Sequence, residues 1–336
     1  MASVAALLVL TGCGGGPDAL PEYELSGSAM GTAFSVKLVA PPPDLDPGEL
    51  QQHIEGRLAA IEGSMSTYRL ESEVSRFNAY DGTGWFEISA ALCGALQDAM
   101  HISELTGGSF DITVGPLVNL WGFGPDGAVV RPPDARRVAA LLERVGYARL
   151  HTDCSRPAVR KDVPGLFVDL SAYAKGLAAD RIAAILDDRR VGRYLVEIGG
   201  ELHVRGKNSR GEDWAIAIEK PARTNRSVQT VVAITDAAMA TSGDYRNFFE
   251  HEGRYYSHTI DPRTGYPVSH DTASVTVIAE STAFADAMAT ALLVLGREAG
   301  MELAEREGLP AYFQVRSGDR IEEHMTEEFA ELLPQR

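Results

Sequence analysis

His258 is the side chain of this sequence best suited to moving a proton, and it stands beside a stretch that the chain must hold rigidly. Residues 254–260 are rich in aromatic and β-branched side chains, which predicts a strand, and residues 261–267 (DPRTGYP) are turn-forming. Two prolines fix backbone angles there, and Gly265 permits a left-handed one. His258 could act as a general base near neutral pH, or it could be a satisfied structural histidine at a hairpin corner.

Asp286 and Thr290 lie four residues apart in an alanine-rich stretch, so on a helix they share one face. Both offer the hard oxygen ligands that Mg²⁺ prefers, and substrate phosphate oxygens commonly complete such a site. The alternative is that Asp286 interacts with the helix N-terminal dipole while Thr290 bonds back to its own helix.

Lys175 is expected in the first turn of a helix that follows a short strand at residues 166–168 and that Ser171 would cap. The helix dipole disfavours a cation at this end, so the lysine should have an anion to meet. A phosphate bound at the helix N-terminus is one candidate, and a simple ion pair with Asp169 is the other.

Two further stretches could contact a flat ligand. Glycines on both sides of Ser109, Phe110 and Asp111 let the backbone approach closely, and Tyr68 could stack on an aromatic ring system. Each stretch also has a plainer interpretation, with Phe110 as a core residue and Tyr68 as a wedge at a helix end.

Taken in order, these motifs resemble those of the ApbE family, the FAD:protein FMN transferases, over residues 28–296. Each motif is weak alone, but the ordered set is specific. The set comprises residues 30–32 (MGT), 65–68 (MSTY), 109–111 (SFD), 169–176 (DLSAYAKG), 198–200 (IGG), 240–245 (ATSGDY), 257–267 (SHTIDPRTGYP) and 285–290 (ADAMAT). Tyr173 and Glu201 depart from the family pattern, which often has a smaller aliphatic residue and Asp there, but neither change removes a polar group that the mechanism needs.

The resemblance implies that the protein binds FAD and Mg²⁺, moves the FMN half onto a Thr or Ser hydroxyl of a partner protein, and releases AMP. It implies that His258 is the general base. It assigns the metal to Asp286, Thr290 and the backbone carbonyl of Ala172. It assigns the FAD contacts to Met30, Tyr68, Ser109, Phe110, Asp111, Asp169, Lys175 and Ile260.

The implied acceptors are flavin-carrying subunits of redox pumps, namely the sodium-pumping NADH:quinone oxidoreductase (Nqr) and the Rnf complex. Some relatives instead split FAD with water into FMN and AMP. The sequence therefore leaves two alternatives open: a periplasmic FAD diphosphatase, and a non-catalytic FAD-binding lipoprotein.

The elements that must position these residues predict an α+β fold, because consecutive strands dominate the second half while helices precede and follow them. Strands are expected at residues 23–29, 32–39, 166–168, 194–198, 202–205, 214–218, 228–234, 237–241, 254–260 and 273–279. Helices are expected at residues 49–61, 89–105, 133–145, 171–186, 282–295 and 298–307. No convincing linker interrupts this pattern, so we expect one ApbE-like domain with a sheet-rich part and flanking helices.

The composition excludes a nucleic-acid partner, because the 336 residues carry a net charge of −16 and phosphate binding by nucleic-acid readers needs a basic face. An anionic ligand would need a local metal ion or a helix N-terminus instead. Cys93 and Cys154 have no metal-type spacing, and Cys93 has the pattern of a small core residue. The sequence does not establish whether the two cysteines pair.

The N-terminus, residues 1–12, resembles a bacterial lipoprotein signal peptide cut before Cys13, whose thiol would carry lipid. No Lys or Arg precedes its apolar run, which departs from that pattern, and a disordered N-terminus is the alternative. Residues 13–21 would form a flexible tether and residues 22–336 the flavin transferase domain. We therefore expect a protein anchored by lipid on the periplasmic side of the inner membrane.

Overall fold

The structure is a computed structural model, and it describes residues 19–222, 227–245 and 247–334. The predicted signal peptide, Cys13 and most of the tether lie outside the described residues. Among the described residues, no helix has the length and the apolar run that crossing a membrane requires.

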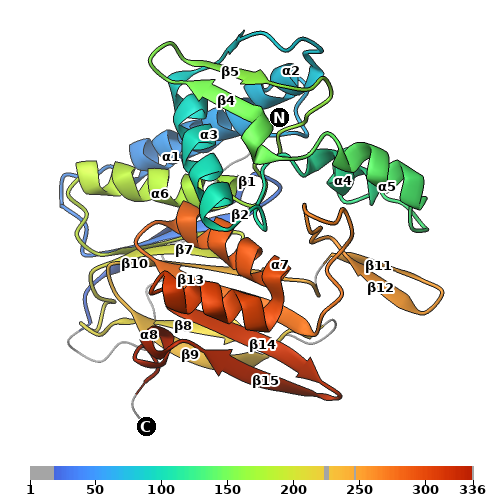
Figure 1. Cartoon of the computed structure of the whole chain (residues 1–336). Coiled ribbons are helices and arrows are strands. Elements are labelled where there is room, and N and C mark those ends of the chain that lie inside the picture. The colour runs from blue at the N-terminus through green and yellow to red at the C-terminus, as the bar shows by residue number, and fades with distance from the viewer. Residues whose placement is uncertain (1–18, 223–226, 246, 335–336) are drawn as a thin grey trace.

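A central antiparallel sheet of eight strands organises the molecule, in the order β1-β2-β6-β7-β10-β13-β14-β15 (Figure 1). Its strands are β1 (Glu22–Ala29), β2 (Thr32–Val39), β6 (Tyr194–Ile198), β7 (Glu201–Arg205), β10 (Ala237–Gly243), β13 (Thr272–Ala279), β14 (Ala311–Ser317) and β15 (Arg320–Met325). In the sheet, β6 lies between β2 and β7. Strands β2 and β6 are therefore neighbours, although they are far apart in the sequence.

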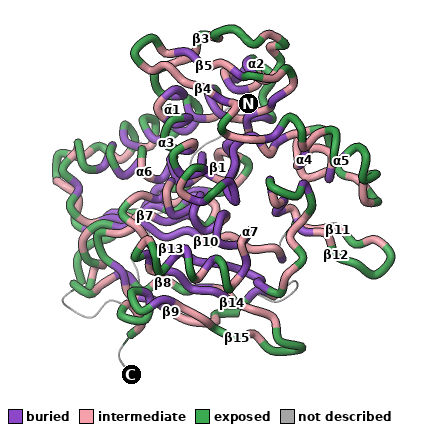
Figure 2. Tube along the Cα trace, viewed as in Figure 1, coloured by how far each residue is buried: buried purple, intermediate pink, exposed green. Residues whose placement is uncertain are grey.

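Each face of the sheet carries its own hydrophobic core, because successive side chains of a strand point to opposite faces. Val196 and Ala240 pack under helices, whereas their neighbours Leu195 and Met239 pack into a second core on the other face. The helical face carries α1 (Pro47–Met65), α3 (Ala90–Leu105), α6 (Ala174–Asp188) and α7 (Thr282–Arg306). The other face carries the hairpin of β8 (Trp214–Glu219) and β9 (Val228–Ile234), together with α8 (Glu327–Ala330). Buried residues concentrate in the middle strands of the sheet (Figure 2).

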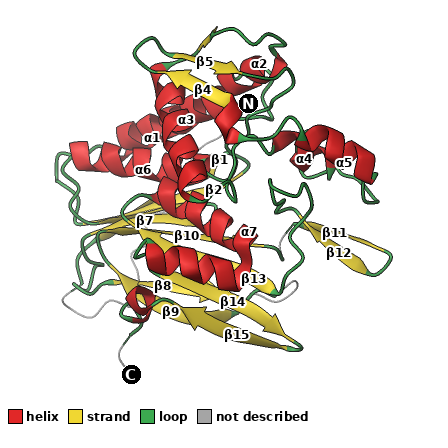
Figure 3. Ribbon diagram, viewed as in Figure 1, coloured by secondary structure: helices red, strands yellow, loops and turns green. Residues whose placement is uncertain are grey.

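Smaller elements surround these layers (Figure 3). A three-stranded sheet of β3 (Phe86–Glu87), β5 (Ala158–Lys161) and β4 (Leu150–Asp153) lies near α2 (Glu73–Ala79) and the 3₁₀ turn η1 (Tyr147–Arg149). Helices α4 (Gly115–Leu120) and α5 (Ala135–Leu142) share a third hydrophobic core with the loop after the hairpin of β11 (Phe248–His251) and β12 (Arg254–Ser257).

Helices α6 and α7 are in close contact, and this contact positions the residues that could do chemistry. A Cβ atom on Gly176 would lie 2.4 Å from the carbonyl oxygen of Thr282, so only glycine fits there. Asp180 of α6 caps the N-terminus of α7, because its carboxylate accepts hydrogen bonds from the backbone N–H groups of Thr282 (2.8 Å) and Ala283 (3.0 Å).

The α+β class and the single domain are confirmed, and most expected elements lie where the sequence placed them. Several expectations were wrong. Residues 166–168 form one isolated bridge rather than a strand, because Phe167 pairs only with Val114. The helix expected from residue 171 begins at Ala174, since the Ser171 hydroxyl donates to Asp169 instead of capping the helix. The strand expected to reach residue 260 ends at Ser257.

The break that the sequence placed between residues 295 and 298 is a kink rather than a helix end. Gly296 has non-helical backbone angles (φ 76°, ψ −179°) inside α7, and a side chain there would meet the ring of His270. The strands β3, β4, β5, β11, β14 and β15 and the short helices α2, α4 and α8 were not predicted.

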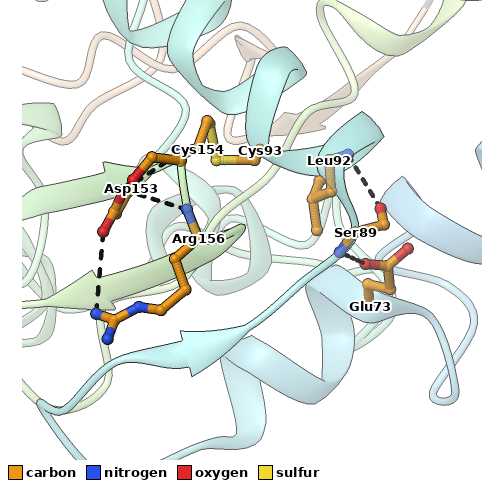
Figure 4. The surroundings of a disulfide bond; sticks show 8 residues. Glu73, Ser89, Leu92, Cys93, Asp153, Cys154 and Arg156 are labelled. Carbon is orange, nitrogen blue, oxygen red and sulfur yellow. Dashed lines mark hydrogen bonds and ion pairs between the residues drawn. A yellow bond between two sulfur atoms is a disulfide. The ribbon is translucent and has the colours of Figure 1, made fainter.

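A disulfide joins Cys93, which is buried in α3, to Cys154, which follows β4 (Figure 4). Their Cα atoms are 5.7 Å apart, and the two cysteines are separated by 61 residues of chain. The bond therefore holds the small sheet against the helical layer, and it settles the pairing that the sequence left open.

Removing this disulfide should lower the free energy of unfolding. A crosslink across a loop of this length reduces the chain entropy of the unfolded state by an amount worth about 4 kcal/mol. We expect the Cys93→Ala/Cys154→Ala double variant to show that loss in urea unfolding. The wild type should lose a similar amount on adding dithiothreitol, to which the variant should be insensitive. A wild-type midpoint unmoved by reductant would contradict the prediction.

Candidate active site

One cavity of about 910 Å³ is lined by nearly all the residues that the sequence analysis proposed for catalysis, metal binding or FAD binding. Its lining includes Tyr68, Ser109, Phe110, Asp111, Asp169, Ala172, Lys175, His258, Ile260, Asp286 and Thr290. Met30 lies instead at the turn between β1 and β2, outside the lining, with a left-handed φ of 54° and its N–H bonded to Glu62. Its contact with FAD stays a prediction.

Lys175 forms the centre of a buried charge cluster. Its ammonium lies 2.5 Å from Glu201 and 3.7 Å from Asp286, so the ion pair with Asp169 that the sequence offered as an alternative does not form. Burial opposes the charge of Lys175, but the two carboxylates outweigh it and raise its pKa. Burial and the nearby Asp286 raise the pKa of Glu201 to about 7. One cation thus balances two carboxylates that water reaches poorly.

Asp286 also contacts the start of α6, and this contact leaves a carbonyl unpaired. Gly176 donates its backbone N–H to the Asp286 carboxylate at 3.3 Å. In a regular helix that N–H would bond to the carbonyl of Ala172, four residues earlier. Within the described part of the chain, the Ala172 carbonyl accepts no hydrogen bond. An oxygen lone pair is therefore available beside the carboxylate.

These oxygens fit Mg²⁺ by their chemistry. The set is one carboxylate (Asp286), one hydroxyl (Thr290) and one unpaired carbonyl (Ala172), all lining the same cavity. The described residues contain no cluster of three or more His, Cys, Asp or Glu side chains suited to a metal ion. A cation held by so few protein charges keeps coordination positions for phosphate oxygens, as Mg²⁺ sites commonly do. The Thr290 hydroxyl lies 2.9 Å from that of Ser242, so it does not merely bond back to its own helix.

His258 is held in one tautomer by the backbone. Its Nδ1 lies 3.0 Å from the carbonyl oxygen of Asn247, which also accepts the His258 backbone N–H. Because a carbonyl only accepts, Nδ1 carries the proton of the neutral ring and Nε2 keeps the lone pair. Burial lowers the pKa of His258, against the opposing effects of the Asn247 bond and of Asp244. The ring is thus neutral and able to accept a proton near pH 7.

The turn after His258 is held by contacts with other parts of the structure. Ile260 bridges to Pro267, and the Trp121 indole donates to the Gly265 carbonyl at 2.9 Å. Gly265 has a φ of 80°, and a Cβ atom there would lie 2.8 Å from Val138. The loop is therefore anchored to α4 and α5, which fixes the backbone that carries His258.

The residues expected to meet a flat ligand play mixed roles. Tyr68 is 66% exposed at the cavity and its hydroxyl lies 3.5 Å from the Phe123 carbonyl, so its ring is available for stacking. Phe110 both lines the cavity and belongs to the core, which combines the two interpretations. The Asp111 carboxylate accepts bonds from the backbone N–H groups of Thr113 and Tyr147, and it therefore shapes its own loop. Burial, which outweighs these bonds, raises its pKa.

Asp169 likewise organises the loop that leads into α6. Its carboxylate accepts the backbone N–H of Ser171 at 2.9 Å, and its own N–H donates to the Ile112 carbonyl at 2.7 Å. One carboxylate oxygen is therefore used inside the loop.

Sequence reasoning missed several residues that line the cavity. Ser242 stood inside the motif at residues 240–245, and Glu201, which follows the motif at residues 198–200, was noted only as a departure from the family pattern. Neither side chain was assigned a contact. Asn247 carried no sequence signal, because it acts through its backbone carbonyl.

The model of the ApbE family matches residues 30–313 of this chain. The chain belongs to the ApbE family. It is 41% identical to an FAD:protein FMN transferase of Vibrio cholerae, over 99% of this chain and 98% of that protein. It is 37% identical to an FAD:protein FMN transferase of Escherichia coli K12, over 99% of this chain and 97% of the other.

Solved structures agree with this assignment. The flavin transferase ApbE of Vibrio cholerae superposes with a TM-score of 0.87 at 40% identity, covering 94% of this chain and all of that one (100%). The apo flavinyl transferase ApbE of Pseudomonas stutzeri superposes with a TM-score of 0.85 at 38% identity, covering 94% and 98%. The charge cluster around Lys175 is thus part of an ApbE-family cavity.

Replacing Lys175 by Met should destabilise this ApbE-family protein in a pH-dependent way. Glu201 and Asp286 would remain buried without a cation, and breaking such a pair typically costs about 3 kcal/mol. Since the folded-state pKa of Glu201 is raised, protonation at lower pH favours the folded state. The loss in urea unfolding should be largest near pH 8 and shrink towards pH 5.

The matched control is Arg190→Met, which removes the exposed ion pair with Asp44 and should change stability by no more than about 0.5 kcal/mol. A Lys175→Met loss that is the same at both pH values would contradict the charge-cluster interpretation.

Proposed function

We propose that this flavinyltransferase of the ApbE family is Mg²⁺-dependent and transfers FMN from FAD to a Thr or Ser hydroxyl of a partner protein. The observation that carries the proposal is that one cavity contains a neutral, backbone-anchored histidine and a cation-binding set of oxygens. The names of the relatives support the transfer of FMN from FAD to protein.

The atoms balance as a single phosphoryl transfer. The acceptor hydroxyl oxygen forms a bond to the phosphorus of the FMN half, and the bond from that phosphorus to the bridging oxygen breaks. AMP leaves with the bridging oxygen, and the hydroxyl proton passes to Nε2 of His258. The product is a phosphoester between FMN and the partner protein.

His258 acts as the general base in this proposal. A threonine hydroxyl is a weak nucleophile until its proton is removed, and a positioned base contributes about 10²–10⁴-fold to the rate. The Asn247 carbonyl keeps Nδ1 protonated, so the proton is accepted at Nε2. The lowered pKa of His258 keeps the ring unprotonated at neutral pH.

The remaining residues bind and orient the substrate. Lys175 offers its ammonium to the diphosphate beside the N-terminus of α6, where backbone N–H groups also favour an anion. Asp286, Thr290 and the Ala172 carbonyl would hold Mg²⁺, which when bound neutralises the charge that develops on the diphosphate oxygens. Tyr68 and Phe110 would contact the flavin. The other proposed FAD contacts are Met30, Ser109, Asp111, Asp169 and Ile260.

The partner and the location belong to the same proposal. The acceptor is a flavin-carrying subunit of the Nqr or Rnf type. The protein works on the periplasmic side of the inner membrane, held by a lipid on Cys13, which lies outside the described residues.

Replacing His258 by Ala should abolish transfer without abolishing FAD binding. Loss of the base predicts a fall in kcat of at least about 100-fold. Transfer is measured as covalent flavin fluorescence of the acceptor on a denaturing gel, and FAD binding is measured separately by fluorescence quenching. The control is His251→Ala on the neighbouring strand β11, which should transfer normally. Unchanged transfer by His258→Ala would refute the base assignment.

Replacing Asp286 by Asn should raise the Mg²⁺ requirement. The amide keeps the size of the side chain but loses the charge, so activity should fall at low Mg²⁺ and recover partly at high Mg²⁺. The thermal midpoint of the wild type should rise with Mg²⁺, and that of the variant should rise less. Glu302→Gln, at an exposed position of the same helix, serves as the control. A variant whose Mg²⁺ dependence equals that of the wild type would exclude Asp286 as a ligand.

A further inference from the structure

The cavity extends beyond the catalytic residues to the opposite face of the central sheet. Its lining there comes from strands and includes Leu195 and Glu197 of β6, Leu202 of β7, Met239 of β10, and Ala215 and Ala217 of β8, together with the charged residues Lys37 of β2 and Glu219 of β8. Leu195, Leu202 and Met239 belong to the hydrophobic core on the face away from α6 and α7. We call this part of the cavity the far lobe, and none of the proposed FAD or metal contacts lies in it.

The far lobe is connected to the part of the cavity that contains Lys175 and His258 at a place where two strands of the sheet stop pairing. Strand β10 pairs with β7 only along residues 237–239, so residues 240–243 continue without β7 beside them. Glu201, which holds Lys175, stands at the start of β7, and the cavity lining includes both Glu201 and Thr241. The charge cluster is therefore next to the opening between the two faces.

Strand β8 presents the backbone groups of Ala215 and Ala217 to the far lobe. They lie between Asp213 and Glu219, whose carbonyl groups accept hydrogen bonds from the side chains of Asn208 and Gln314. Ala233 of β9 lies opposite Ala215, but its N–H donates to Leu332 instead. In an antiparallel pair this makes Ala215 a residue whose N–H and C=O point away from β9. The same holds for Ala217, two residues further along the ladder. Within the described parts of the chain, neither alanine makes a hydrogen bond on that outer edge.

The spacing of these groups fits an extended peptide. Ala215 and Ala217 repeat their outward donors and acceptors about 6.6 Å apart, which is the repeat of a second strand. Their methyl side chains are small and exposed, so they leave room for a partner backbone. Leu195 and Leu202 provide an apolar floor below it.

We propose that an extended segment of the acceptor protein adds as a strand to the outer edge of β8, and so delivers its hydroxyl to His258 through the shared cavity. This inference rests on the proposed transferase function. Strand addition obtains affinity from main-chain hydrogen bonds, which depend little on the side chains of the acceptor. A few residues of extended chain, at about 3.3 Å each, connect the edge to the reacting end.

The decisive variant is Ala217→Pro. Proline removes the outward N–H and is tolerated on an edge strand whose N–H faces solvent, so the β8–β9 ladder is preserved. Losing one such bond and leaving its partner unpaired should raise KM for a purified Nqr-type acceptor subunit about tenfold. The affinity for FAD and the kcat at saturating acceptor should not change. Ala217→Ser, which keeps the N–H, is the control and should behave as the wild type.

Hydrogen–deuterium exchange on the unmodified full chain gives an independent measurement. Adding the acceptor subunit should slow exchange of the Ala215 and Ala217 amides in β8. Strand β15, which is also an edge strand, should be unaffected.

Several results would overturn the proposal. These are a folded Ala217→Pro variant with an unchanged acceptor KM, protection of β8 by FAD alone, or protection that follows self-association of the protein in sedimentation. A wild-type protein that labels no acceptor would instead refute the transferase function, so the two failures are distinguishable.

Discussion

The close contact between α6 and α7 is the constraint on which the site depends. Gly176 lets the start of α6 reach the carbonyl of Thr282, and Asp180 caps α7 from the neighbouring helix. Because the two helices are fixed to each other at this point, Lys175 near the start of α6 lies 3.7 Å from Asp286, which is in the second turn of α7. A larger side chain at position 176 would separate the ammonium from the carboxylate.

This contact also changes the hydrogen bonding around Asp286. Asp286 takes the N–H of Gly176 away from its helical partner, and the carbonyl of Ala172 is left unpaired. An unpaired carbonyl in a half-buried place is costly unless a ligand satisfies it. The same geometry thus places a carboxylate, an ammonium and a free carbonyl close together.

At His258, the protein uses a backbone carbonyl rather than an acidic side chain to orient the imidazole ring. The Asn247 carbonyl fixes the tautomer of His258, and the turn behind it is anchored by Trp121 to the α4–α5 part of the structure. A neutral partner for the imidazole adds no further negative charge to a cavity that already contains the carboxylates of Glu201 and Asp286.

The sequence by itself determined the local features, because these depend on nearby residues. It placed the strands β6 and β9 at their bounds, a helix break close to the kink at Gly296 and the turn around Gly265, and the family motifs identified eleven of the residues that line the cavity. Only the tertiary structure decided the partners. Lys175 pairs with Glu201 and Asp286 rather than with Asp169, six residues away, and Cys93 pairs with Cys154. These choices depend on how helices and strands distant in the chain pack, and periodicity and turn chemistry do not encode such packing.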